Sequence, residues 1–380
     1  MAHSPPLARR PRLAPAPWQV VLALALVYLT AVFALNNADL LTFVTPGACF
    51  AACQGMANCP LEPAAGYDGQ FAYYIARDPL HAAPCLDVPA YRYQRILLPL
   101  LGHALALGDV RWLPLALVAI NLAALVGATA ALEHLLAAQR VSRWYALVFG
   151  LFVGVFMSVR LSTTEPLAYG LVVAAIWLHQ RGRAGPGAVA FLLAALAKET
   201  TLAFAAGYML SYALAGRWRA ALRLALVVGA PFALWQAALY LWLGAFGVGS
   251  GGAGNAPFEI IPFNGFWRVA YDPTGSPRAF VVMTIYTLPA IILPTVWGLW
   301  QAGRDLWRGL HHPYAACLAV NALVMAFVPF STYREPLGTL RFMVGLVLSF
   351  LLYAALRFPG RRPLRYTPVW LALSVYLAAG

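Results

Sequence analysis

Long apolar runs, separated by short segments that carry arginine, dominate the 380-residue sequence. Several runs reach the ~20 residues that a helix needs to cross a bilayer. Hydrophobic residues make up 62% of the chain and charged residues only 10%, whereas a soluble domain is roughly a quarter charged. Strands that alternate over ~10 residues, as in an outer-membrane barrel, are not evident. The sequence therefore predicts an all-α, polytopic integral membrane protein and excludes a soluble enzyme.

The apolar runs predict about eleven membrane crossings, judged by the length a span requires. The predicted crossings lie near 18–36, 112–132, 144–159, 166–180, 186–197, 200–215, 222–246, 280–300, 313–330, 338–357 and 366–379. The run 186–197 is too short to span a bilayer unless it is tilted or continues through Lys198. The apolar segment 95–108 is also short, and we expect it to be a helix that lies in the outer interface.

The positions of the basic residues predict which loops face the cytoplasm. The net charge is +13, and arginines cluster in every second gap, near 9–12, 140–143, 181–183, 217–223, 304–308 and 357–365. Arginine-rich loops stay in the cytoplasm, so we assign these gaps and the N-terminus to that side. With this assignment, most acidic residues fall in the outside loops. We expect a bacterial inner (plasma) membrane protein with its active face outside, embedded in the lipid bilayer and with no nucleic-acid partner.

The same assignment divides the chain into four parts. Residues 1–17, rich in proline and arginine, are expected to form a cytoplasmic disordered tail. A transmembrane core covers 18–245 and includes a large outer loop at 37–91. A second outer loop covers 246–279; its glycine-rich start is typical of a hinge, so the loop is either a lid or a connector. Residues 280–380 form the C-terminal transmembrane helices.

Four of the five cysteines, namely Cys49, Cys53, Cys59 and Cys85, lie in the 37–91 loop. An even number of cysteines in an oxidising compartment predicts two disulfides, and three connectivities are open. A zinc site is the alternative, although Cys-x3-Cys-x5-Cys is not a standard ligand spacing. Cys317 lies alone in an apolar run, where we expect it to pack.

Polar and ionisable residues recur where the predicted helices end at the outer face. Such residues are costly near a membrane and usually functional. They are Tyr67, Asp68, Gln70, Tyr74, Arg92, Arg95, Glu165, Lys198, Glu199, Arg334, Glu335 and Arg341. Their convergence on one face predicts a cavity. The alternative is a set of local salt bridges that close loop ends, such as Lys198–Glu199 or Arg334–Glu335.

Three of these segments resemble the GT-C superfamily of membrane glycosyltransferases, which includes protein O-mannosyltransferases, GPI mannosyltransferases and the lipid A aminoarabinose transferase. The segment 67–76, YDGQFAYYIA, is similar to a first outer loop in which a catalytic Asp beside an aromatic residue precedes a short helix. The segment 162–167, STTEPL, resembles the region of a second acid at the same face. The segment 195–200, ALAKET, is similar to a Lys-Glu pair between short helices. The likeness covers roughly residues 18–245, in which the first loop has one Asp instead of an adjacent acidic pair.

The resemblance implies transfer of a sugar from a polyprenyl-phosphate donor to a lipid, glycan or protein acceptor. It implies Asp68 as the general base, with Glu165 assisting; Asp68 could instead be a turn residue or a helix cap. Residues expected at the donor phosphate are Arg92, Arg95, Lys198, Arg334 and Arg341. Residues expected at the sugar and acceptor are Tyr67, Gln70, Tyr74, Glu199 and Glu335. No cofactor is certain; Asp68 and Glu165 together could hold a divalent metal, but no ligand spacing supports a metal site.

Two other functions are compatible with the same residues. A transporter or flippase for an anionic lipid or solute would also gather cations near breaks in its helices. A non-catalytic subunit of an envelope-glycan assembly complex would need no catalytic base. The transporter is disfavoured because the charges lie near one face and no internal repeat is evident. The residues do not exclude the subunit. We favour the glycosyltransferase because the resemblance implies it.

Overall fold

A computed structural model describes residues 15–51, 53, 66–252, 254, 256–273 and 275–378. Within these residues the regular structure is helical, apart from one isolated antiparallel bridge between Pro46 and Gly66. The all-α class predicted from the sequence is therefore confirmed. The predicted tail falls almost wholly outside the described residues, and the first helix begins at Pro17.

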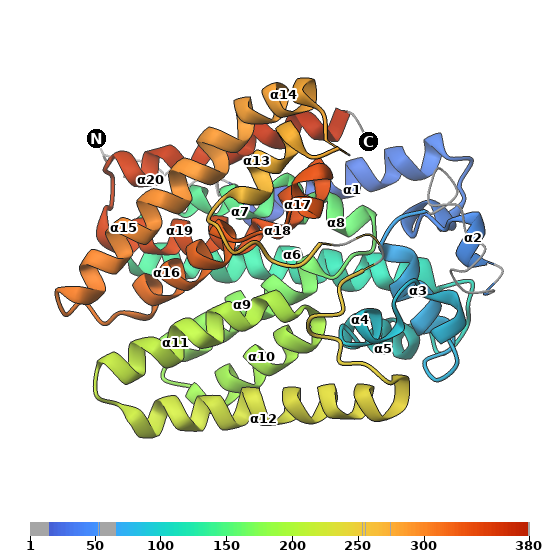
Figure 1. Ribbon diagram of the computed structural model, residues 1–380, viewed down its shortest axis with the longest axis horizontal. Coiled ribbons are helices and arrows are strands. Elements are labelled where there is room, and N and C mark those ends of the chain that lie inside the picture. The colour runs from blue at the N-terminus through green and yellow to red at the C-terminus, as the bar shows by residue number, and fades with distance from the viewer. Residues whose placement is uncertain are drawn as a thin grey trace, which may run out of the picture.

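The helices follow one another in chain order (Figure 1). The first half contains α1 (Pro17–Leu35), η1 (Leu40–Phe43), α2 (Ala48–Ala51), α3 (Gly69–Arg77), η3 (Ala83–Cys85), α4 (Pro89–Tyr93), α5 (Leu97–Leu105), α6 (Leu113–Ala138), η4 (Arg143–Ala146), α7 (Leu147–Gly150), α8 (Val153–Arg160), α9 (Glu165–Gln180) and α10 (Ala184–Ala197). The second half contains η5 (Glu199–Thr201), α11 (Leu202–Leu214), α12 (Trp218–Leu243), α13 (Asn264–Tyr271), α14 (Pro277–Thr287), η6 (Leu288–Ile292), α15 (Leu293–Trp307), α16 (Pro313–Ala326), α17 (Phe330–Arg334), α18 (Pro336–Phe342), α19 (Val344–Arg357), α20 (Arg362–Tyr366) and η7 (Thr367–Ala378).

Four helices in the described part of the chain are long and apolar enough to cross a membrane. They are α1, α6, α12 and the continuous helix Phe280–Trp307, which comprises most of α14 together with η6 and α15. The number rises to six if each of two bent pairs is one span, namely Arg143–Gly150 with Val153–Arg160 and Pro336–Phe342 with Val344–Arg357. Every other predicted crossing also contains a helix, but α9, α10, α11 and α16 have only 13 to 16 residues. The structure is thus compatible with a membrane protein, while eleven crossings are not shown.

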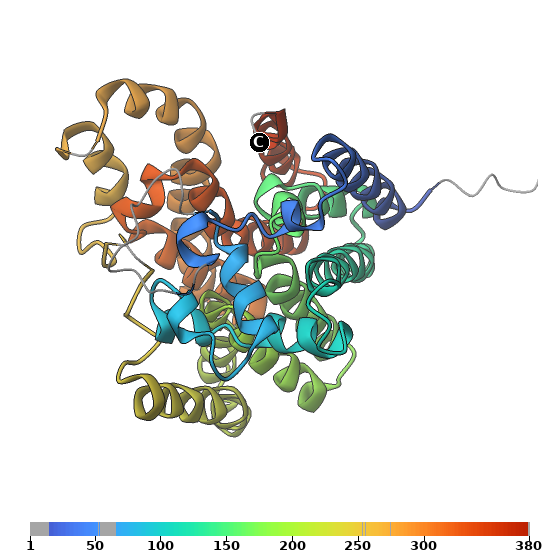
Figure 2. The ribbon, with the colours of Figure 1, turned by 90° about the vertical axis from the view of Figure 1, so that its right-hand side faces the viewer.

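The long helices run side by side along the molecule, and the short elements gather at one end of them (Figure 1). Helix α9 packs against α6 and α10, and α16 packs against α11, α15 and α19. We call the end formed by α2 to α5 the loop end. Figure 2 looks onto it and shows these elements in front of the bundle, between α12 on one side and α13 with α14 on the other.

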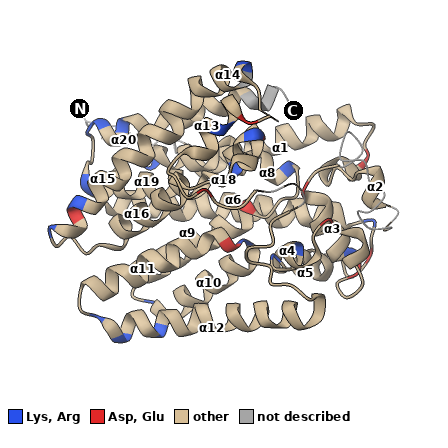
Figure 3. Cartoon of the chain, viewed as in Figure 1, with Lys and Arg blue, Asp and Glu red and all other residues tan. Residues whose placement is uncertain are grey.

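Basic residues mark the opposite end of the bundle (Figure 3). The connections at 181–183, 215–217, 308–312 and 358–361 carry arginines. At the loop end, acidic and basic residues lie close together. The arginine-rich gaps of the sequence therefore lie at one end of the helix bundle, and the gaps that contain both acidic and basic residues lie at the other end.

The 37–91 segment is more deeply packed than a loop of interfacial helices would be. Residues 69–76, all but the last of α3, are buried, in a second hydrophobic core that also includes Phe50, Leu117 and Leu239. Helix α5 fits the interfacial prediction better, because it exposes leucines at 100, 101 and 105 while it buries Leu98. The predicted 246–279 loop is partly helical, since it contains α13 and the start of α14.

A disulfide between Cys53 and Cys85 confirms that the 37–91 segment is cross-linked. Cys49 is also disulfide-bonded, and Cys59 lies outside the described residues. Cys317 is a free, buried thiol in α16.

We predict that unreduced, denatured protein from an oxidising compartment contains one titratable thiol, that of Cys317. Reduction should release the remaining four cysteines. Replacing Cys85 by serine should destabilise the protein by about 2–4 kcal/mol, because the unfolded chain regains the freedom that the cross-link removes. Thiol counting and thermal unfolding in detergent test this, and five thiols without reduction would contradict it.

The separation of charge also predicts the orientation in the membrane. The 37–91 segment should face outside and the 357–366 segment should face the cytoplasm, because arginine-rich connections are retained inside. Leu80→Cys and Pro359→Cys place single probes at exposed positions of the two segments. A membrane-impermeant maleimide should label the first variant in intact cells and the second only after permeabilisation. Equal labelling of both in intact cells would overturn the orientation.

Candidate functional site

Three segments meet at the loop end because two glycines allow close contact between backbones. A Cβ on Gly69, at the start of α3, would stand 1.9 Å from the carbonyl oxygen of Leu161. A Cβ on Gly154, in α8, would stand 2.1 Å from the carbonyl oxygen of Leu340, in α18. The start of α3 therefore packs against the end of α8, and α18 packs against the start of the same helix.

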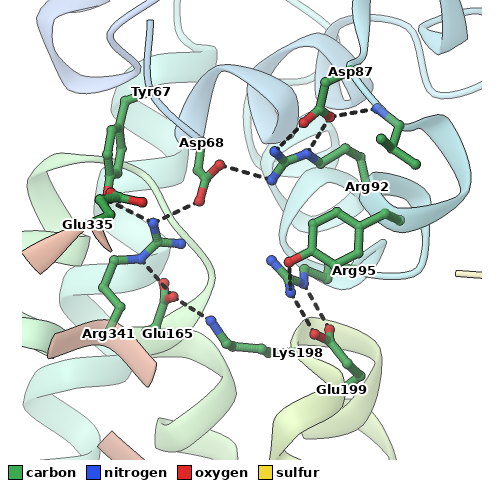
Figure 4. A network of polar contacts seen from close by, with 12 residues as sticks. Tyr67, Asp68, Asp87, Arg92, Arg95, Glu165, Lys198, Glu199, Glu335 and Arg341 are labelled. Carbon is green, nitrogen blue, oxygen red and sulfur yellow. Dashed lines mark hydrogen bonds and ion pairs between the residues drawn. The ribbon is translucent and has the colours of Figure 1, made fainter. Parts of the chain in front are cut away.

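The side chain of Arg341 joins the two predicted catalytic acids (Figure 4). Its Nη1 donates to Oδ2 of Asp68 at 2.7 Å, and its Nε donates to Oε1 of Glu165 at 2.8 Å. Nη1 also donates to the hydroxyl of Tyr67 at 2.9 Å, and that hydroxyl donates to Oε1 of Glu335 at 2.8 Å. The Arg341 side chain is 6% exposed and that of Glu165 is 0% exposed. Charges buried to this extent are tolerated when they are paired.

Asp68 precedes α3 but does not cap it. Its side chain accepts no hydrogen bond from the first turn of the helix. One of its oxygens lies 3.0 Å from Nη1 of Arg92, and the other accepts from Arg341. Burial alone would raise the pKa of the Asp68 carboxyl, but the charges of Arg92 and Arg341 outweigh it and hold the pKa well below its usual range. The helix-cap alternative is therefore wrong, and Asp68 is an ionised group whose side chain is still 34% exposed.

Two further arginines make bidentate contacts with carboxylates. Arg92 donates from Nε and Nη2 to the two oxygens of Asp87, each at 2.6 Å. Arg95 donates from Nε and Nη2 to the two oxygens of Glu199, at 2.8 and 2.6 Å, and Nη2 also donates to the hydroxyl of Tyr91 at 2.7 Å. Paired contacts of this kind fix the plane of each guanidinium. The sequence analysis assigned neither Asp87 nor Tyr91 to the site, although each lies within five residues of the arginine that it contacts.

Lys198 pairs with Glu165, not with its neighbour Glu199. Its Nζ lies 2.6 Å from Oε1 of Glu165, and the two side chains are 6% and 0% exposed. The local pair predicted between Lys198 and Glu199 is absent from the described residues, and so is the pair between Arg334 and Glu335. The local salt-bridge alternative is therefore wrong for both pairs. Lys198, Glu199 and Glu335 have partners distant in the sequence, namely Glu165, Arg95 and Tyr67, whereas Arg334 is exposed.

A cavity of about 570 Å³ opens beside these charges. Asp68, Arg95, Lys198 and Arg341 line it, together with residues 247–249, 251 and 256–258. A smaller hollow of about 30 Å³ is lined by Asp68, Arg92, Arg95, Arg341 and residues 162–164. Figure 4 shows the guanidinium groups of Arg95 and Arg341 facing each other across the space below Asp68.

Three predicted site residues do not join this cluster. Gln70 is 1% exposed, and its Oε1 accepts a hydrogen bond from the backbone N–H of Gly47 at 2.9 Å. Tyr74 is 3% exposed and packs against Tyr73. Arg334 is exposed and lines neither the cavity nor the hollow.

The described residues contain no group of three His, Cys, Asp or Glu side chains that could hold a metal ion. Asp68 and Glu165, the two acids considered as a metal pair, each accept a hydrogen bond from Arg341. Because the guanidinium occupies the place between them, the two carboxylates do not fit a shared cation in this arrangement.

Comparisons of the chain with protein-family models, with curated proteins and with solved structures found no match. The function must therefore be inferred from the geometry of the site.

We predict that Glu165→Gln destabilises the protein by about 3–5 kcal/mol, because Lys198 and Arg341 lose a buried counter-charge. Lys198→Met added to Glu165→Gln should recover part of that loss, since it removes one of the two unpaired cations. The measurement is thermal unfolding of the two single variants and the double variant in detergent. Strictly additive losses would show that the two side chains are not coupled.

Asp109→Asn is the matched control for this series. It removes the carboxylate of the Asp109–Arg111 pair, in which the arginine side chain is 85% exposed. Exposed ion pairs contribute little to stability, so this variant should unfold close to wild type.

Proposed function

We propose that the protein is a membrane glycosyltransferase of the GT-C type. It moves a sugar from a polyprenyl-phosphate donor to a hydroxyl of a lipid, glycan or protein acceptor. The reaction takes place at the outer face of a bacterial inner membrane. The apolar runs predict that the helices cross this membrane about eleven times. The observation that carries the proposal is the placement of Asp68. It is an ionised, partly exposed carboxylate held by two guanidiniums on the wall of a cavity of about 570 Å³.

The transfer requires a proton acceptor. The acceptor oxygen bonds to the sugar's C1, the bond from C1 to the phosphate oxygen breaks, and its electron pair stays on the phosphate. The proton of the acceptor hydroxyl passes to a general base. Asp68 suits this role because it is ionised at neutral pH and its side chain lines the cavity. The two guanidiniums that lower its pKa also weaken it as a proton acceptor, so it acts as the base once those ion pairs loosen. Glu165 suits it less, because its side chain has no exposed surface and its ion-pair partners are Lys198 and Arg341; we assign it to positioning those cations.

The leaving phosphate requires cations with spare hydrogen-bond donors. Within the described residues, Nη1 of Arg95 and Nη2 of Arg341 donate no hydrogen bond. A guanidinium has five N–H donors, so each arginine can bind a phosphate oxygen through this remaining nitrogen. Such preorganised donors stabilise charge that develops in a transition state. Apolar residues such as Leu202, Val324 and Phe342 also line the cavity and suit a lipid-linked substrate.

We predict that Asp68→Asn lowers sugar transfer by about 10²–10⁴-fold, the contribution typical of a general base. Asparagine keeps the shape of the side chain but cannot take a proton at neutral pH. The assay is transfer of a radiolabelled sugar from polyprenyl phosphate in membranes, compared at equal amounts of folded protein as judged by size-exclusion chromatography in detergent.

Asp78→Asn is the control, because it makes the same chemical change at the other end of α3, where the ion-pair partner of the carboxylate within the described residues is the exposed His81. It should transfer sugar at close to the wild-type rate. Activity of Asp68→Asn within a few-fold of wild type would remove Asp68 from the chemistry, and an inactive wild type that carries the lipid across vesicles would favour a flippase.

A further inference from the structure

Segment 256–271, which ends with α13, turns apolar side chains outward and charged side chains inward. Ile260 is 93% exposed and Ile261 is 64% exposed. The two charged side chains of the segment are covered to a greater extent, since that of Glu259 is 8% exposed and that of Arg268 is 31% exposed. The exposed residues are prolines, isoleucines and aromatics, namely Pro257, Phe258, Ile260, Ile261, Pro262, Trp267 and Tyr271. A contiguous apolar surface of this kind marks contact with another molecule or with a membrane.

The inward polar side chains bond to one another and to the backbone behind them. The Oε2 atom of Glu259 accepts a hydrogen bond from Nδ2 of Asn264 at 2.8 Å. Its Oε1 atom accepts from Nη1 of Arg268 at 3.1 Å and from the backbone N–H of Phe330 at 3.2 Å. Nη2 of Arg268 donates to Oδ2 of Asp272 at 2.9 Å. The charges of the segment are therefore paired within the protein and do not depend on water.

The backbone of the segment is also bonded to the protein. The N–H of Glu259 donates to the carbonyl oxygen of Phe327 at 3.0 Å, and the N–H of Phe263 donates to the carbonyl oxygen of Ala326 at 2.6 Å. Both acceptors lie where α16 ends. Irregular backbone is tolerated at membrane depth only where its polar groups are satisfied inside the protein, and these bonds meet that condition.

The segment lies at the level where a candidate membrane span begins. The ring of Trp267 lies 5.7 Å from that of Phe280, the first residue of the span Phe280–Trp307. Helix α13 packs against α14, and Figures 1 and 2 show the two together on the flank of the bundle, away from α2 to α5. The exposed residues of α14 include Val281, Val282 and Ile285. The apolar surface of the segment therefore continues the apolar surface of a span.

We propose that segment 256–271 is embedded in the outer leaflet of the bilayer, so that the predicted outer loop 246–279 returns into the membrane before α14 begins. The partner is the lipid. Ile260 and Ile261 contact the acyl chains, and Trp267 and Tyr271 lie near the headgroups, where amphipathic rings gather. Residues 256–258 also line the cavity of about 570 Å³, so one wall of that cavity borders lipid instead of water.

Spin labels on single cysteines test the proposal in the full chain, reconstituted in vesicles of phosphatidylethanolamine and phosphatidylglycerol. Ile260→Cys carries the label on the segment, and Ile261→Cys is the second variant in case the first does not fold. The wild-type chain, treated in the same way, gives the background, because its free thiol at Cys317 is buried. The readout is the collision rate of the label with oxygen, which enters hydrocarbon, and with a water-soluble nickel complex.

Two matched variants supply the references. Leu234→Cys places the label on α12, a candidate span, at a position that is 71% exposed. Leu80→Cys places it at a position that is 69% exposed, in a turn whose Asp78 and His81 side chains are 53% and 79% exposed. The first should report lipid and the second water.

The label at Ile260→Cys should collide with oxygen and be shielded from nickel, as at Leu234→Cys. Its depth below the headgroups should be about 5–10 Å, the value for segments that lie in the interface. Nickel access equal to that of Leu80→Cys would place the segment in water and overturn the proposal. Shielding from both oxygen and nickel would place a second copy or another protein over the segment and would also overturn it. Neither result depends on sugar transfer.

Discussion

The contact of Arg341 with Asp68 and Glu165 is the interaction on which the loop end depends. It joins residues that are 273 and 176 positions apart in the sequence, and it ties α18 both to the start of α3 and to the start of α9. The Arg341 and Glu165 side chains are almost completely buried, so neither charge can turn to water if its partner is lost. Because each charged side chain is stabilised by its ion-pair partners, the position of each one depends on the positions of the others.

The sequence predicted where the charges gather, but not how they pair. Arginine clusters in alternate gaps predicted that basic residues gather on one side. In the structure, the arginine-rich connections lie at one end of the helix bundle. Pairing depends on side-chain direction, which the sequence does not display. Lys198 has an extended backbone (φ −159°, ψ 120°) where α10 ends, whereas Glu199 starts the next helical turn. The two side chains therefore leave the backbone in different directions, and Lys198 meets Glu165 while Glu199 meets Arg95.

Helical periodicity could have improved the prediction for α3. Phe71, Ala72 and Ile75 follow Asp68 by three, four and seven positions, and they line the hollow with it. Gln70 and Tyr74 follow by two and six positions, which places them on a different face of the helix. They were predicted at the site because the resemblance implied it.

The number of crossings stays a prediction, because helix length alone does not decide it. Hydropathy counts an apolar run as a crossing, but α10 and α11 are short helices that meet at a break, residues 198–201, beside the cavity. In a membrane protein, broken helices are tolerated where their free backbone groups and polar side chains face a cavity. The same break therefore explains both the short helices and the presence of a lysine between two apolar runs.

The net charge of the site determines how an entering phosphate affects the ion pairs. The cations Arg92, Arg95, Lys198 and Arg341 contribute +4, and the carboxylates of Asp68, Asp87, Glu165, Glu199 and Glu335 contribute −5, so the sum is −1. A phosphate that enters makes the site more negative and competes with the carboxylates for the same guanidiniums. Asp68 is the most exposed partner of Arg92 and Arg341, so its ion pairs are the easiest to loosen. As they loosen, the pKa of Asp68 rises from its low value towards the ordinary range. The carboxylate thus becomes a better proton acceptor when the leaving group arrives, which couples the binding of the donor to the activation of the acceptor.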